Sequence, residues 1–245
     1  MSKQIKASLF CIFILCLSCK SILTKIVTNR SIVKNAHYLQ KDDQKVIYLP
    51  MSHLSKYENF EEVKGFINEK RNLGYQVYYE KVTYDINSID YKESSLKMRK
   101  LTGLTFGQKY LSEEQQKFRE NVNDKKYTWQ SKVDYGLNYQ TDIHADYNIT
   151  DLIKAYEDKW GKVILEPCDY NTPLNVKYTC SSPTKYQEVV HDLRNTKLLK
   201  HILDTVPKKK LIVYGLGHYY SSSGVYINLY HRKEYEEVKA KNWKD

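Results

Sequence analysis

Two histidines that follow strand-like runs are the residues of this chain best placed to do chemistry. The apolar run Lys45–Leu49 leads into a turn that carries His53, and the run Lys210–Tyr214 leads into a Gly-Leu-Gly turn that carries His218. The carboxyl ends of parallel strands share one edge of a sheet, where folds of this kind bind ligands. We therefore expect these two histidines, although far apart in the sequence, to meet in space.

Two glutamates complete the expected group. Glu80 and Glu166 each follow a strand-like run of their own. Imidazole nitrogens and carboxylate oxygens together suit a divalent metal such as Mn, Co or Zn. A metal held in this way lowers the pKa of a bound water and polarises a carbonyl group. The pattern predicts a metal-dependent hydrolytic site, with His53, Glu80 and His218 as catalytic residues and metal ligands and Glu166 as a further ligand.

Three other charged or titratable residues are weaker candidates. Arg99 could stabilise an anion, but its Lys-Met-Arg-Lys setting favours a basic helix face. His144 and Asp146 precede a helix start at Asn148, where solvation or capping explains them. The main candidates have ordinary alternatives too, as solvated loop histidines or as charges that merely end a strand.

The elements that would position the site form a strand-helix-strand unit. A strand over 45–49 is followed by helical apolar spacing over 58–72, and Gly74 then opens a strand over 74–79. Such a unit favours parallel strands. The length of 245 residues needs no second domain. We expect a single-domain α/β fold whose mostly parallel sheet is flanked by helices.

The rest of the chain adds a polar helical insertion over about 85–132 and then returns to the alternating pattern. Within the insertion, Ser112-Glu-Glu-Gln115 resembles a capping box and predicts a helix over 113–122. The remaining expectations are a helix over 151–160, a strand over 162–165, a helix over 183–206 and a last strand over 210–214.

The N-terminal sequence is typical of an export signal. Lys3 and Lys6 precede an apolar stretch over 7–18 that is too short to cross a bilayer but suits a signal peptide. Its end, Leu-Ser-Cys19, resembles a bacterial lipoprotein cleavage box, with an uncleaved anchor or a plain secretory signal as the alternatives. We expect residues 1–18 to be removed, Cys19 to carry membrane lipid and residues 19–44 to tether a domain over 45–245 to the bacterial cell envelope, facing the periplasm or the exterior.

Export would place the remaining cysteines in an oxidising compartment. After lipidation of Cys19 only Cys168 and Cys180 are left, in a segment rich in turn formers, so a disulfide between them is expected. Zinc binding by this pair is less favoured, because no second cysteine pair accompanies it. The formal charge of +10 is spread along the chain, which does not favour a nucleic-acid partner and is compatible with an anionic lipid surface.

These residues resemble the TraB/Tiki superfamily, which includes erythromycin esterase-like and ChaN-like proteins. The resemblance covers about residues 45–84 and 205–230, and the stretch from Leu211 to Gly224 with its Gly-Leu-Gly-His is the best match. It implies metal-dependent or water-activating hydrolysis of a peptide or small-molecule substrate by the motif histidines and glutamates. Pro50 stands where the first motif of the family has Gly.

Two other functions remain open from the sequence. The chain could bind rather than cleave, for example haem, with iron held by His218 or by Tyr219. It could also be a degenerate family member that serves as a structural component of the envelope.

Overall fold

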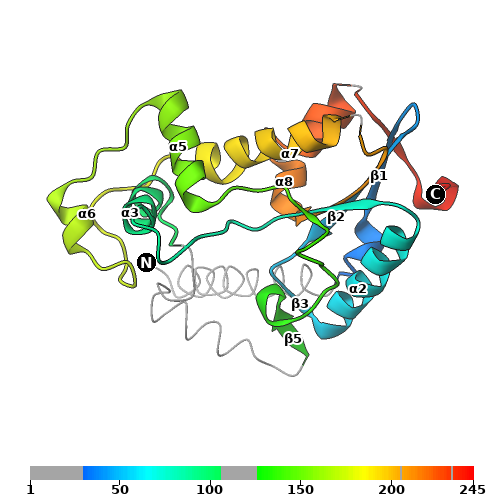
Figure 1. Ribbon diagram of the computed structural model, residues 1–245, viewed down its shortest axis with the longest axis horizontal. Helices are drawn as coiled ribbons and strands as arrows, with labels where there is room; N and C mark the ends of the chain where they lie inside the picture. The colour runs from blue at the N-terminus through cyan, green and yellow to red at the C-terminus, as the bar shows by residue number, and fades with distance from the viewer. Residues whose placement is uncertain (1–29, 106–125, 205, 233) are drawn as a thin grey trace, which may run out of the picture.

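The computed structural model describes residues 30–105, 126–204, 206–232 and 234–245 (Figure 1). The predicted signal peptide, its lipidation site Cys19 and the predicted helix over 113–122 lie outside these residues. Within the described ranges, no helix is long and apolar enough to span a membrane.

A mixed sheet of six strands organises the described part of the chain. Its spatial order is β6-β4-β7-β2-β1-β8; the neighbours from β6 to β2 run parallel, whereas β1 is antiparallel to both of its neighbours. This confirms the predicted α/β fold with a mostly parallel sheet flanked by helices. The strands are β1 (His37–Lys41), β2 (Gln44–Met51), β4 (Gln76–Tyr79), β6 (Ile143–His144), β7 (Lys209–Gly215) and β8 (Glu236–Val238).

Side chains of the central strands alternate between two apolar clusters, one on each face of the sheet. Along β2, Ile47 and Leu49 belong to one cluster, and Val46 and Tyr48 belong to the other. The first cluster includes the apolar residues of α2 (Tyr57–Asn72), which covers that face. The opposite face is covered by α7 (Arg194–Leu203), α8 (Leu216–Tyr220) and the π-helix η5 (Tyr226–His231).

A third apolar cluster lies beside the sheet, and its buried side chains come from helices. It joins α3 (Tyr91–Thr102), α5 (Ile149–Trp160) and the π-helix η4 (Gln187–Leu193). In Figure 1, α3 and α5 lie on the left, away from β1 and β2. The start of α5 is as predicted, because the Asn148 side chain accepts a hydrogen bond from the backbone N–H of Asp151 at 2.8 Å.

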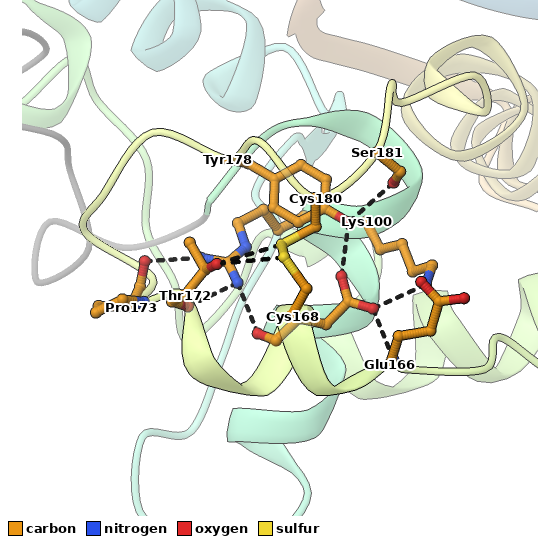
Figure 2. Close-up of a disulfide and its surroundings, with 10 residues drawn as sticks. Lys100, Glu166, Cys168, Thr172, Pro173, Tyr178, Cys180 and Ser181 are labelled. Carbon is orange, nitrogen blue, oxygen red and sulfur yellow. Dashed lines mark hydrogen bonds and ion pairs between the residues drawn. A yellow bond between two sulfur atoms is a disulfide. The ribbon is translucent and has the colours of Figure 1, made fainter.

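The predicted disulfide between Cys168 and Cys180 is present, with Cα atoms 5.8 Å apart (Figure 2). Cys168 lies in the short helix α6 (Pro167–Asn171). The buried Arg99 of α3 donates to the backbone carbonyls of Asp169, Thr172 and Pro173 at 2.7–2.9 Å. Arg99 therefore fastens the disulfide loop to α3, and it lies on no exposed basic helix face.

A small second sheet supports the turn after β2. It pairs β3 (Leu54–Lys56) with β5 (Tyr127–Trp129) in antiparallel register. The 3₁₀-helix η3 (Gln130–Lys132) follows β5 at once, and the Gln130 N–H donates to the backbone carbonyl of His53 at 2.9 Å. Two further 3₁₀-helices, η1 (Val33–Asn35) and η6 (Ala240–Asn242), lie near the ends of the described chain.

Two sequence predictions about the elements need correction. The strand predicted over 162–165 is wrong, because this stretch has no regular structure and the Val163 N–H bonds instead to the Glu157 side chain at 3.0 Å. The tether predicted over 19–44 ends too late, since residues 37–41 form β1 inside the sheet and Leu39 is fully buried. The helix predicted over 183–206 is present as η4 and α7, over 187–203.

Candidate active site

The neighbouring strands β4 and β7 bring two of the predicted residues into contact. Glu80 directly follows β4, and its backbone N–H donates to the carbonyl of Val213 in β7 at 3.1 Å. Its side-chain Oε2 accepts from the Gly215 N–H at the end of β7 at 2.5 Å. His218, in α8 just beyond, places its Nε2 at 3.5 Å from Glu80 Oε1. The carboxyl edge of the sheet therefore joins Glu80 to His218, as the parallel arrangement predicts.

A buried arginine at the start of α7 also binds the Glu80 carboxylate. Arg194, the first residue of α7, donates from Nη2 to Glu80 Oε1 at 2.6 Å. The same guanidinium bonds both oxygens of Asp146, at 2.9 Å from Nε and 2.7 Å from Nη2. Asp146 is fully buried and bound to this guanidinium. The sequence prediction of a solvated or helix-capping Asp146 is therefore wrong. One arginine thus holds two carboxylates at the end of the sheet.

This environment keeps Glu80 ionised. Burial alone would raise the pKa of Glu80, but the Arg194 guanidinium and the hydrogen bond from His218 outweigh burial and hold the pKa well below its usual range. Burial would likewise lower the pKa of Arg194, but Asp146 and Glu80 raise it well above its ordinary value. The site therefore carries a fixed carboxylate and a fixed cation near neutral pH.

His53 reaches the same place from the end of β2, and it is exposed to solvent. Its Nδ1 lies 3.2 Å from Gln130 Oε1, and the Gln130 side chain also bonds the Tyr135 side chain. An amide oxygen can only accept, so Nδ1 carries the proton that it donates to Gln130. In the neutral ring, the opposite nitrogen, Nε2, is then the one without a hydrogen, so it can act as an acceptor. When His53 is protonated, its positive charge also helps to lower the pKa of Glu80.

His53, Glu80 and Arg194 line one cleft of about 590 Å³. This size suits a small molecule or a few residues of a peptide. Its walls combine polar, aromatic and aliphatic side chains. The other lining residues are Lys81, Val82, Leu104, Trp129, Gln130, Ser131, Val133, Tyr135, Tyr139, Tyr186 and Val190. His218 lies behind Glu80, is 4% exposed, and is not among the residues that line the cleft; its Nε2 approaches the Glu80 carboxylate.

The donors at this site do not form a good metal cage. Among the described residues, no three His, Cys, Asp or Glu side chains are placed to hold one ion. Glu80 Oε1 is bound by Arg194 and Oε2 by the Gly215 N–H, so a metal would have to displace a cation and a backbone donor. His218 Nδ1 is bonded to Asn195 at 2.7 Å, and Nε2 faces the carboxylate. The residues present therefore do not fit the metal site predicted from the sequence.

Glu166 lies apart from these residues. It precedes α6 beside the disulfide loop, where its carboxylate pairs with Lys100 at 3.4 Å and its side chain is 65% exposed (Figure 2). The strand expected to carry it to the sheet edge is absent, which is why the predicted fourth ligand does not join the site. Arg99 is also remote, buried under the same loop. His144 closes β6 and bonds the Lys81 carbonyl at 2.5 Å.

The haem alternative finds little support in the geometry. Tyr219 is fully buried between His37, at 3.9 Å between ring centroids, and Tyr48, at 4.8 Å. Burial raises the pKa of the Tyr219 hydroxyl well above its usual value, which opposes the tyrosinate that an iron ligand requires. His218, the other expected ligand, is almost fully buried. An iron ligand at Tyr219 would therefore require His37 and Tyr48 to move away from its ring.

Sequence reasoning missed Arg194, Asn195 and His191. Arg194 had a usable signal, because it lies four residues from Val190 and four from Leu198 on an apolar helix face. A charge in that position is rarely buried without a partner. His191 approaches His218 with ring centroids 5.1 Å apart, and burial together with the charges of His218 and Arg194 lowers its pKa. Asn195 gave no pattern that would single it out.

Gly215 offers a direct probe of the Glu80 position. A Cβ at Gly215 would lie 2.8 Å from Glu80 Oε2, so Gly215→Ala is expected to push the carboxylate aside and to lower the free energy of unfolding by about 1–3 kcal/mol. Gly65 in α2 is the matched control, because a Cβ there meets nothing within 4 Å. Gly65→Ala should raise the free energy of unfolding by about 0.5–1 kcal/mol. Urea unfolding measures the free energy of unfolding of both variants. Equal changes in the two would contradict the close contact between Gly215 and the Glu80 carboxylate.

Comparisons of the chain with protein-family models, with curated proteins and with solved structures find no match. The resemblance to the TraB/Tiki superfamily therefore stays a prediction of the sequence.

Proposed function

We propose that the cleft at the carboxyl edge of the sheet is the active site of a hydrolase that cleaves an ester or amide bond by activating water with His53. One observation carries this proposal: the exposed His53 and the ionised Glu80 line the same cleft, His53 beside the Gln130 amide and Glu80 bound by the Gly215 N–H. A positioned base of this kind suits proton abstraction from water.

The proposed reaction consumes one water. Nε2 of His53 takes a proton from the water while the water oxygen attacks the carbonyl carbon of the substrate. The proton then passes from His53 to the leaving oxygen or nitrogen as its bond to carbon breaks, giving a carboxylic acid and an alcohol or amine. The negative charge of Glu80 stabilises the imidazolium that forms in between.

Because Arg194 holds Glu80 in its charged form, Glu80 stabilises the imidazolium of His53 and does not act as the base. A carboxylate already bound by Arg194 and by the Gly215 N–H is a poor proton acceptor, because its low pKa keeps it charged. It acts instead as a fixed negative charge. The polar side chains of Gln130, Ser131 and Tyr135 and the rings around the cleft would hold a peptide or small-molecule substrate against His53.

The predicted location remains part of this proposal. A disulfide between Cys168 and Cys180 is in keeping with an exported protein, because disulfides persist in oxidising compartments. The lipid on Cys19 and the place in the bacterial cell envelope stay predictions of the sequence.

Metal removal separates this proposal from the metal-dependent alternative. The protein, dialysed exhaustively against a chelator, is expected to hydrolyse 4-carbamoylphenyl acetate at the same rate as before dialysis, because His53 needs no metal to accept a proton. Release of the phenol is followed by absorbance. A rate that disappears on dialysis and returns with Mn, Co or Zn would instead support the metal site predicted from the sequence. No hydrolysis before dialysis, on this ester or on a panel of peptides, would contradict the hydrolase.

A further inference from the structure

One charged side chain of the cleft takes no part in the proposed reaction. Lys81, the residue after Glu80, lines the cleft and is exposed to solvent. The other two charged lining residues besides His53 are Glu80 and Arg194, and these bind each other at 2.6 Å. In the part of the chain that the structure describes, no carboxylate lies within ion-pair distance of the Lys81 ammonium group, so this cation has no counterion there.

The main chain at Lys81 is fixed beside the sheet. His144, which closes β6, donates from Nε2 to the Lys81 carbonyl at 2.5 Å. The N–H of Glu80, one residue earlier, donates to the Val213 carbonyl in β7 at 3.1 Å. The backbone therefore holds the Lys81 side chain at the carboxyl edge of the sheet, while its flexible stem lets the ammonium group adjust to a ligand.

An aromatic ring of the cleft wall supports the ammonium group. Lys81 Nζ lies 4.7 Å from the centroid of the Tyr139 ring, within the range of a cation–π interaction. Tyr139 also lines the cleft, and its ring packs edge-on against buried Tyr79 with ring centroids 5.3 Å apart. A ring face attracts the cation without neutralising its charge. The ammonium group therefore keeps donors for an anion that enters the cleft.

The carboxylates of the loop that carries this ring are paired with other cations. Asp142 is bound by Arg71 at 2.9 Å, and Asp134 is bound by Lys64 at 2.8 Å. Neither of these carboxylates competes for Lys81. Among the described residues that line the cleft, the one carboxylate is that of Glu80, which Arg194 already holds. An anion beside Lys81 would thus meet an unneutralised cation.

We propose that Lys81 is a specificity-determining residue that makes the cleft select ester or amide substrates carrying a carboxylate away from the bond that is cleaved. The inference rests on the proposed function for the reaction, whereas binding of a carboxylate by Lys81 does not depend on it. An ammonium group is a compact charge with three donors, so it pairs with a carboxylate without demanding one geometry. An uncharged substrate of the same shape gains no such contact.

Two pairs of esters of matched shape measure this preference. The first pair, 4-carboxyphenyl acetate and 4-carbamoylphenyl acetate, places the carboxylate or its neutral amide on the leaving group. The second pair, phenyl 4-carboxybenzoate and phenyl 4-carbamoylbenzoate, places it on the acyl group. Each kcat/KM is divided by the rate of the same ester with imidazole alone, which removes differences in intrinsic reactivity. The wild type is expected to favour the carboxylate about 5- to 10-fold in at least one pair.

Three variants test whether Lys81 causes the preference. Lys81→Gln removes the charge and should abolish the preference, whereas Lys81→Arg should keep it. Lys159→Gln is the matched control, because Lys159 is also exposed and lies 4.3 Å from the Trp160 ring centroid but does not line the cleft. A preference that survives in Lys81→Gln would overturn the inference. So would an equal loss on both esters of a pair, which is the result expected if Lys81 stabilised the oxyanion.

Binding of the two products of the first pair separates this inference from the proposed function. Isothermal titration calorimetry compares 4-hydroxybenzoate with 4-hydroxybenzamide. Tighter binding of 4-hydroxybenzoate that is lost in Lys81→Gln, in a protein that hydrolyses none of the esters, would uphold carboxylate binding by Lys81 and contradict the hydrolase. Equal binding of both compounds, together with ester hydrolysis that shows no preference in either pair, would overturn the role of Lys81 and leave the hydrolase in place.

Discussion

Arg194→Met is expected to lower the free energy of unfolding by about 3–5 kcal/mol, the usual cost of removing one partner from a buried ion pair. The variant leaves Glu80 and Asp146 buried without their shared cation; in the native protein the side chains of Arg194 and Asp146 are 6% and 0% exposed. Urea unfolding near neutral pH measures the change.

The pH dependence of this effect has a definite sign. The pKa of Glu80 is lowered in the folded protein, so its contribution to stability is present above the unfolded pKa of about 4.3 and is lost as the pH falls. Without Arg194 that contribution is gone. The stability difference between the wild type and Arg194→Met should therefore shrink as the pH is lowered below about 4.

Two further variants test the reason for the loss. The triple variant Arg194→Met, Glu80→Gln and Asp146→Asn removes all the charges together and should recover much of the stability, because no carboxylate is left unpaired. Arg71→Met is the matched control, since Arg71 pairs with Asp142 but its side chain is 29% exposed. Equal losses in Arg194→Met and Arg71→Met would contradict a special role for the buried cluster.

His53→Gln is expected to lower kcat/KM for ester hydrolysis by about 10²–10⁴-fold, the range that a general base contributes. Glutamine is close to histidine in size and polarity but cannot accept the proton of an attacking water. Because His53 is exposed and bonds mainly to Gln130, the melting temperature should change little. His231→Gln is the matched control: His231 ends η5 and does not line the cleft. A similar loss in both variants would point to a general effect of the substitution.

The sequence predicted the strands and helices that make the framework. The apolar runs over 45–49 and 210–214 and the helical spacing over 58–72 are properties of each segment alone, so they could be recognised before the fold was known. The prediction of a strand over 162–165 failed because three consecutive apolar residues, Val163 to Leu165, can also lie in an irregular connection after a helix, here held by the Glu157 side chain. Short apolar runs do not distinguish these cases.

The contact of Glu80 with His218 could also be predicted, because parallel strand ends meet at one edge. The partners of Glu80 could not. Arg194 and Asp146 are 48 residues apart in the sequence and reach each other only through packing of α7 against the sheet. The prediction of a metal site assumed that the strand-end glutamate was free, and only the fold shows that its oxygens are taken. Hydrogen-bond partners decide the chemistry, and they are not local in the sequence.

The central claim, that His53 is the base that activates water, is tested most directly by chemical rescue of His53→Ala in chelator-treated protein. The rate of 4-carbamoylphenyl acetate hydrolysis is measured with increasing imidazole, and the uncatalysed reaction with imidazole alone is subtracted. If the account is right, His53→Ala has almost no activity, and imidazole restores activity in proportion to its free-base concentration. Activity equal to that of the wild type without imidazole, or a loss that imidazole does not relieve while the fold is intact, would contradict it.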